Sequence, residues 1–135
     1  MTGFGPQLIG QTEKALGALL GEVLAGTRID QRQWVALRLT AQTDGTRAAA
    51  DVVRAEAHLA DADDLIDQLA ALGLVAEGRV TEAGRRLIVT VTGRVDQLMG
   101  PVWQAVDPAD LAAAERALHT VRDGARAALG QIPQR

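Results

Sequence analysis

The side chains best suited to bind a metal ion or to catalyse a reaction lie between positions 58 and 67, where His58 is followed by Asp61, Asp63 and Asp64. An imidazole and several carboxylates this close together could bind a divalent metal ion. The chain has only two histidines and no cysteine, and the aspartates lack the spacing, glycine and glutamate of an EF-hand loop. No Ser-His-Asp arrangement or glycine-rich phosphate loop is visible either. We therefore predict no metal, no cofactor and no enzymatic activity.

The same aspartates have a structural explanation. They stand at the start of a predicted helix, with Asp61 as N-cap and Asp64 as the third helical residue. Carboxylates in the first turn of a helix complement its dipole. Residues 56–73 nevertheless contain five carboxylates and no lysine or arginine to offset them. Such a helix would repel the phosphates of DNA.

Cations that could contact phosphate flank this helix in the sequence. They are Arg47, Arg54, Arg79, Arg85 and Arg86. With His58 and the three aspartates Asp61, Asp63 and Asp64 they form our candidate DNA-binding set. The alternative is that these arginines are solvated, or paired with Asp51 and Glu82.

The two tryptophans, Trp34 and Trp103, are candidates for lining a small-molecule pocket at a dimerisation junction. For Trp34 core packing is the favoured alternative, since large aromatic side chains are usually well buried.

Composition limits the fold class. Hydrophobic residues make up 47% of the 135 residues but aromatic residues only 2%, so Leu, Val and Ala must build the core. A composition rich in Leu and Ala and poor in aromatic residues favours helices over sheets. A net charge of -3 gives no overall attraction to nucleic acid. No apolar stretch reaches the roughly 20 residues needed to cross a bilayer, and the first residues do not resemble a signal peptide. We expect a cytoplasmic protein without a membrane segment.

Apolar residues recur every three or four positions along most of the chain. The expected helices cover residues 6–24, 31–42, 47–54, 59–72, 82–106 and 108–129. Asp30 and Gln33 should form a capping box, Asp44-Gly45 a turn, and Gly73 the end of the fourth helix. Residues 74–76 and 79–80 should pair across Glu77-Gly78, with Gly78 at positive φ. Pro101 should kink the fifth helix near Leu98, and Asp107-Pro108 should start the last one.

This order of helix, turn, helix and small hairpin predicts a mainly α-helical winged helix-turn-helix with a very short two-stranded β wing. From Ile29 to Leu129 the chain resembles the multiple antibiotic resistance regulator (MarR) family of bacterial transcription factors. The resemblance rests on IDQRQWVALRLTAQTDG, on DQLAALGLV, on VTEAGRRL after the wing and on VDPADLAAAERAL. It implies a homodimer whose two winged helices read palindromic double-stranded DNA, often released by a small-molecule effector.

The resemblance implies that residues 1–135 form a single MarR-like domain. Residues 29–82 would form the winged helix-turn-helix, and residues 1–28 and 83–135 the dimerisation helices. Two features depart from the family pattern: the recognition helix is acidic, and the wing is reduced to Ala76–Arg79. Two hypotheses follow. The protein is either a dimeric DNA-binding regulator, or a dimer of the same fold that has lost ordinary DNA binding and acts as a protein-interaction or ligand-sensing module.

Overall fold

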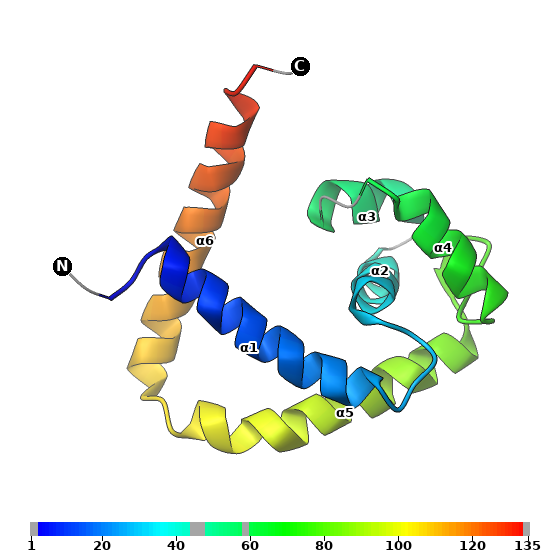
Figure 1. Ribbon diagram of the computed structural model, residues 1–135, viewed down its shortest axis with the longest axis horizontal. Coiled ribbons are helices and arrows are strands. Elements are labelled where there is room, and N and C mark those ends of the chain that lie inside the picture. The colour runs from blue at the N-terminus through cyan, green and yellow to red at the C-terminus, as the bar shows by residue number, and fades with distance from the viewer. Residues whose placement is uncertain (1–2, 44–47, 58–59, 134–135) are drawn as a thin grey trace. The chain divides into compact units, whose positions relative to one another are not determined.

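The computed structural model describes residues 3–43, 48–57 and 60–133. Within these ranges the chain forms six helices and one two-stranded antiparallel sheet (Figure 1). The predicted fold class, a mainly α-helical winged helix-turn-helix, is confirmed. The contacts divide the chain into two compact units, Met1–Asp96 and Gln97–Arg135.

The first unit begins with α1 (Pro6–Leu24) and α2 (Gln31–Gln42), both with the predicted bounds. The capping box at the start of α2 is confirmed. The Asp30 carboxylate accepts a hydrogen bond from the Gln33 backbone N–H, and the Gln33 side chain accepts one from the Asp30 N–H, both at 2.9 Å. These two bonds satisfy backbone donors that would otherwise lack partners, and so fix where α2 starts.

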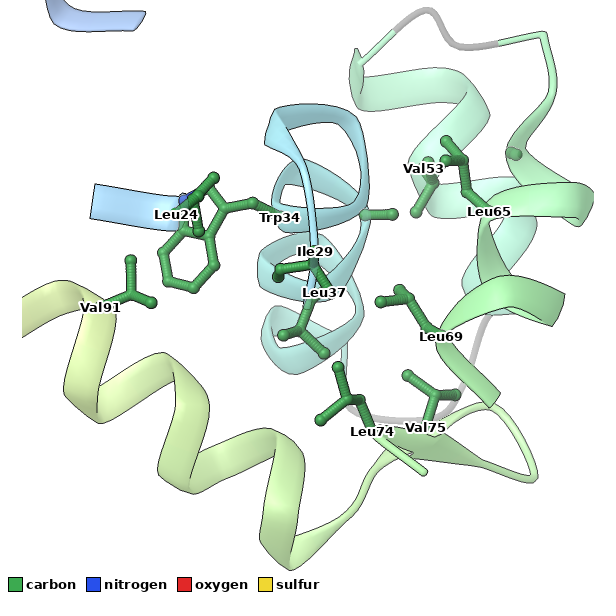
Figure 2. Close-up of a cluster of buried hydrophobic side chains, with 12 residues drawn as sticks. Leu24, Ile29, Trp34, Leu37, Val53, Leu65, Leu69, Leu74, Val75 and Val91 are labelled. Carbon is green, nitrogen blue, oxygen red and sulfur yellow. The ribbon is translucent and has the colours of Figure 1, made fainter. Parts of the chain in front are cut away.

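Helix α2 lies at the centre of the hydrophobic core and packs against α1, α3 (Ala49–Ala57) and α4 (Ala62–Ala71). Leu24, Trp34 and Val91 lie on one side of it, and side chains of α3 and α4 lie on the other (Figure 2). Trp34, Ala36 and Leu37 are buried, so the helix is covered on more than one side. Ala41, which lies on the same apolar stripe of the sequence as Trp34 and Leu37, is exposed.

Helices α3 (Ala49–Ala57) and α4 (Ala62–Ala71) follow. The predicted end of α3 at residue 54 is wrong, because the helix continues to Ala57. Alanines 55 and 57 have high helix propensity, and neither glycine nor proline interrupts the segment. The predicted Asp44-Gly45 turn and the predicted helix start at Arg47 lie outside the described residues.

Helix α4 ends in a Schellman motif. Gly73 has φ 77°, the Gly73 N–H donates to the Ala70 carbonyl, and the Leu74 N–H donates to the Leu69 carbonyl, each at 3.0 Å. Leu69 and Leu74 are both buried, which supplies the apolar contact typical of this motif. The prediction that Gly73 ends the helix is confirmed.

The wing consists of β1 (Val75–Ala76) and β2 (Arg79–Val80), with Val75 opposite Val80. Glu77 and Gly78 connect the strands with φ of 53° and 76°. Positive φ at both positions is the requirement of a type I′ turn, whose twist suits a two-residue hairpin. Gly78 was expected at positive φ, whereas Glu77 was not, because glutamate rarely adopts this conformation.

Helix α5 (Glu82–Gln104) starts beside the wing and runs into the second unit. Thr81 joins wing to helix: its Oγ1 donates to the Gly73 carbonyl at 2.7 Å and accepts from the Gly84 N–H at 3.1 Å. The helix is continuous through Pro101 and ends two residues before the expected residue 106. The kink near Leu98 stays a prediction.

Helix α6 (Pro108–Gly130) belongs to the second unit and starts where expected. Asp107 accepts a hydrogen bond from the Ala109 N–H at 2.8 Å, and proline occupies the first turn, where a missing N–H costs nothing. Across the described part of the chain, no helix combines the length and hydrophobicity that a membrane crossing needs.

Candidate nucleic-acid interface

The apolar residues of α4 pack into the core, so the aspartates between them lie on the face exposed to solvent. Ala62, Leu65 and Leu69 are at most 3% exposed, so the intervening Asp63 and Asp64 point to solvent. The side chain of Asp63 is 78% exposed. Between residues 48 and 86 the sequence carries eight carboxylates and four arginines. The helix-turn-helix and wing therefore have an excess of negative charge.

Asp61 occupies the predicted N-cap position of α4, but its carboxylate forms no capping hydrogen bond. Its backbone, with φ of -94° and ψ of 30°, departs from the extended conformation usual for an N-cap. The carboxylate pairs with the Arg32 guanidinium of α2 instead. The prediction that the Asp61 side chain caps α4 is wrong, because this carboxylate pairs with the Arg32 guanidinium and not with a backbone N–H of α4.

Arg54 of α3 forms two ion pairs. Its Nη1 donates to Asp51 and its Nη2 to Asp63, both at 3.0 Å. The contact with Asp51 is the pairing that the alternative hypothesis expected, and with the Arg32 pair the contact with Asp63 offsets two carboxylates at the start of α4. The offsetting cations lie outside residues 56–73, on α2 and α3, where counting charges along one segment does not find them.

Residues at the start of α2 and in the loop before it also contact the rest of α4 and its C-terminal end. Gln33 Nε2 donates to Gln68 Oε1 at 2.9 Å, and Arg28 donates to the Leu72 carbonyl at 3.2 Å at the helix C-terminus. With Arg32, these residues contact α4 at its beginning, middle and end. The contacts join positions 29 to 44 residues apart, so no local sequence pattern indicated them.

The remaining arginines of the candidate set differ in their pairing. Arg85 pairs with Glu82 at 3.1 Å and donates to the Val80 carbonyl at 3.1 Å, as the alternative hypothesis expected. Arg79 on β2 and Arg86 on α5 are exposed, and neither forms an ion pair with another described residue. Arg47 and His58 lie outside the described residues.

The two tryptophans have different environments. Trp34 is 7% exposed and belongs to the core, which agrees with the packing alternative. The guanidinium carbon of Arg38 lies 5.5 Å from its ring centroid, a cation–π distance, and Arg38 Nη1 is 3.4 Å from Thr92 Oγ1. Trp103 belongs to the second unit and is 48% exposed.

A shallow pocket of about 380 Å³ lies where α1 meets α2. Its lining includes buried Leu24 and Ile29 and the polar side chains of Arg28, Asp30 and Gln33, but neither tryptophan. Among the residues that the structure describes, no group of three or more histidine, aspartate or glutamate side chains is placed to hold a metal ion.

Helix α6 has no buried residue. Its apolar side chains Leu118, Val121 and Leu129 are 42%, 47% and 51% exposed in the single chain. On α1, Leu8 and Leu16 are 43% and 38% exposed. Each unit therefore presents an apolar helix face to solvent.

Comparison with known proteins identifies the fold. No protein-family model matches the chain, and no curated protein is similar to it in sequence. Among solved structures, a MarR family protein from Bacillus stearothermophilus is 23% identical, with a TM-score of 0.70 over 89% of this chain and 91% of that one. A transcriptional regulator (MarR family) from Rhodococcus sp. RHA1 is 21% identical, with a TM-score of 0.73 over 84% and 90%.

CouR from Rhodococcus jostii RHA1, solved bound to p-coumaroyl-CoA, is 20% identical, with a TM-score of 0.72 over 84% of this chain and 88% of that one. These similarities cover nearly the full length of each protein. The chain therefore has the fold of MarR-family regulators, as its sequence motifs predicted.

Proposed function

We propose that the protein is a dimeric, MarR-type transcription regulator that acts in the cytoplasm on double-stranded DNA and has no enzymatic activity. The observation that carries this proposal is the similarity to MarR-family structures over 84–89% of the chain. Residues 29–82 would form the DNA-binding winged helix-turn-helix, residues 1–28 and 83–135 would form the dimer, and Arg86 at the start of the second dimerisation segment would also contact DNA.

The exposed apolar faces of α1 and α6 support a homodimer. A helix of 23 residues with no buried side chain contributes little to the stability of a lone chain. A second copy can cover Leu118, Val121 and Leu129 through a symmetric contact, which also creates two winged helices related by a two-fold axis. Such a pair suits a palindromic operator.

Arg79 and Arg86, which form no ion pair with another described residue, would supply attraction to the DNA backbone. Arg79 and Arg86 are exposed and can reach phosphates without first losing an ion pair. Asp63 and Asp64 would read base edges, since a carboxylate can accept a hydrogen bond from the cytosine N4 amino group in the major groove. DNA binding of this kind would be weak on random sequences, because the carboxylates of α4 repel phosphates.

A small-molecule effector is part of the proposal, and CouR, a neighbour in fold, was solved bound to p-coumaroyl-CoA. Trp34 and Trp103 remain the proposed ligand-contacting residues from the sequence. Arg38 lies over the Trp34 ring and is partly buried. A cation beside an aromatic ring suits a ligand that carries an anionic group and an aromatic ring.

A second candidate function is a protein-interaction module with the same dimeric fold. The observation that favours it is the charge of α4, where Asp63 and Asp64 are exposed while Arg54 is already paired. A basic protein surface would be attracted to this helix, whereas DNA would be repelled.

Titration of the protein with two DNA duplexes distinguishes the two functions. One duplex carries the sequence upstream of the protein's own gene, and the other is a shuffled sequence of the same composition. A regulator should prefer the upstream duplex and bind it more weakly at about 200 mM than at about 50 mM salt. Equal, negligible binding to both duplexes would contradict the regulator and favour the interaction module.

A further inference from the structure

Arg54 lies between a carboxylate of its own helix and a carboxylate of the proposed recognition helix. Its Nη1 contacts Asp51 Oδ1 and its Nη2 contacts Asp63 Oδ2, each at 3.0 Å. Both terminal nitrogens of the guanidinium therefore already hold a negatively charged oxygen. A DNA phosphate would use the same two nitrogens, because bidentate guanidinium binding is the usual geometry for both groups.

The two ion pairs are open to solvent. The side chains of Arg54, Asp51 and Asp63 are 44%, 64% and 78% exposed. Exposed pairs of this kind are weak and exchange readily for other partners. The carboxylates consequently compete with phosphate for Arg54 without removing the arginine from the surface.

We propose that Asp63 raises the sequence specificity of DNA binding by withholding Arg54 from phosphates on unsuitable sequences. On a suitable sequence, the N4 amino group of a cytosine in the major groove donates a hydrogen bond to the Asp63 carboxylate, and Arg54 is free to bind a phosphate of the DNA backbone. On other sequences Arg54 stays paired with Asp63, and the complex lacks that phosphate contact. This inference rests on the proposed DNA-binding function and assigns a specificity-determining role to one ion pair.

The expected magnitude follows from the strength of an exposed pair. Releasing Arg54 from Asp63 should tighten non-specific binding about two- to fivefold for each protomer. For a dimer the effect multiplies to roughly four- to twenty-five-fold. Because each added phosphate contact steepens the dependence of log K on log salt by about 0.9, the dimer should gain about 2 in this slope.

The test compares Asp63→Asn with Asp64→Asn in the full chain. Asp64 is the adjacent residue, also exposed on the first turn of α4, and it forms no ion pair with another described residue. Both substitutions remove one exposed charge from the first turn of α4, so their general electrostatic effects are similar. Each is also made in an Arg54→Gln background, where no guanidinium remains to be released.

Binding to a random duplex of about 30 base pairs, long enough for two half-sites one turn apart, is measured by fluorescence anisotropy at several salt concentrations. The inference predicts that Asp63→Asn tightens binding and steepens the salt slope more than Asp64→Asn does, and that this excess disappears with Arg54→Gln. Equal effects of the two substitutions, or an excess that persists without Arg54, would overturn it. Those results would leave the proposed function standing if the upstream duplex is still preferred, whereas no binding by any variant to either duplex would overturn both.

Discussion

Gly84, in the first turn of α5, should tolerate no side chain, and this tests how the wing is attached to the helix. A Cβ added at Gly84 would lie 2.7 Å from Val80 Cγ1 and closer still to the Leu74 carbonyl oxygen. That oxygen accepts the Thr81 N–H at 3.0 Å, so it cannot move away without breaking the bond that closes the base of the hairpin. Gly93, later in α5, is the matched control, because its added Cβ would meet nothing within 4 Å among the described residues.

The magnitudes follow from two opposing effects. Replacing glycine by alanine at an exposed position inside a helix stabilises a protein by about 0.5–1 kcal/mol, and we expect the full gain for Gly93→Ala. At Gly84 the overlap costs about 1–3 kcal/mol, as other overpacked sites do. We therefore expect Gly84→Ala to lower the free energy of unfolding by about 1–2 kcal/mol while Gly93→Ala raises it.

Thermal and urea unfolding followed by circular dichroism measure both changes. At about 3–4 °C per kcal/mol for a chain of this size, Gly84→Ala should melt several degrees below the wild type and Gly93→Ala a few degrees above it. The protein concentration must be the same throughout, because a dimer's melting temperature depends on it. If Gly84→Ala were as stable as Gly93→Ala, the close packing of the wing on α5 would be refuted.

Three further predictions concern single features of the fold. Asp30→Ala should lower the free energy of unfolding by about 1 kcal/mol, because the capping box of α2 is lost; an unchanged urea midpoint would contradict this. Gly78→Val should lower the free energy of unfolding by about 1 kcal/mol or more, because residue 78 has a φ of 76°. Glu77→Asn should raise it slightly, because asparagine suits a type I′ turn. If neither substitution changed the melting temperature, the assignment of a type I′ turn would be wrong. Leu118→Glu combined with Val121→Glu should convert the proposed dimer into a monomer in sedimentation velocity, and a double variant that still sediments as a dimer would exclude α6 from the interface.

Local chemistry made most of the helix boundaries predictable. The Asp30 capping box, the Asp107-Pro108 start and the Gly73 end each depend on residues within a few positions of one another, so their sequence signals were sufficient. The end of α3 was predicted too early because the break was inferred without a glycine or proline to cause it. The Glu77 conformation was missed because the hairpin as a whole, and not the intrinsic preference of glutamate, sets its φ.

The candidate site was less predictable, because its electrostatics depend on contacts between distant segments. The carboxylates of α4 could be found in the sequence, but the Arg32 and Arg54 partners of Asp61 and Asp63 come from α2 and α3. The same holds for Gln33 and Arg28, which hold α4 at Gln68 and Leu72. Charge counted along one helix therefore overstated how unfavourable this surface is for DNA.

Sedimentation velocity of the protein with its own upstream duplex tests the central proposal most directly, since it measures dimerisation and DNA binding together. The proposal predicts a dimer in the absence of DNA, and a complex of one dimer per duplex that forms at about 50 mM salt and dissociates at higher salt. The shuffled duplex should form this complex only at higher protein concentration. A protein that sediments as a monomer at micromolar concentration, and independently of either duplex, would contradict the account.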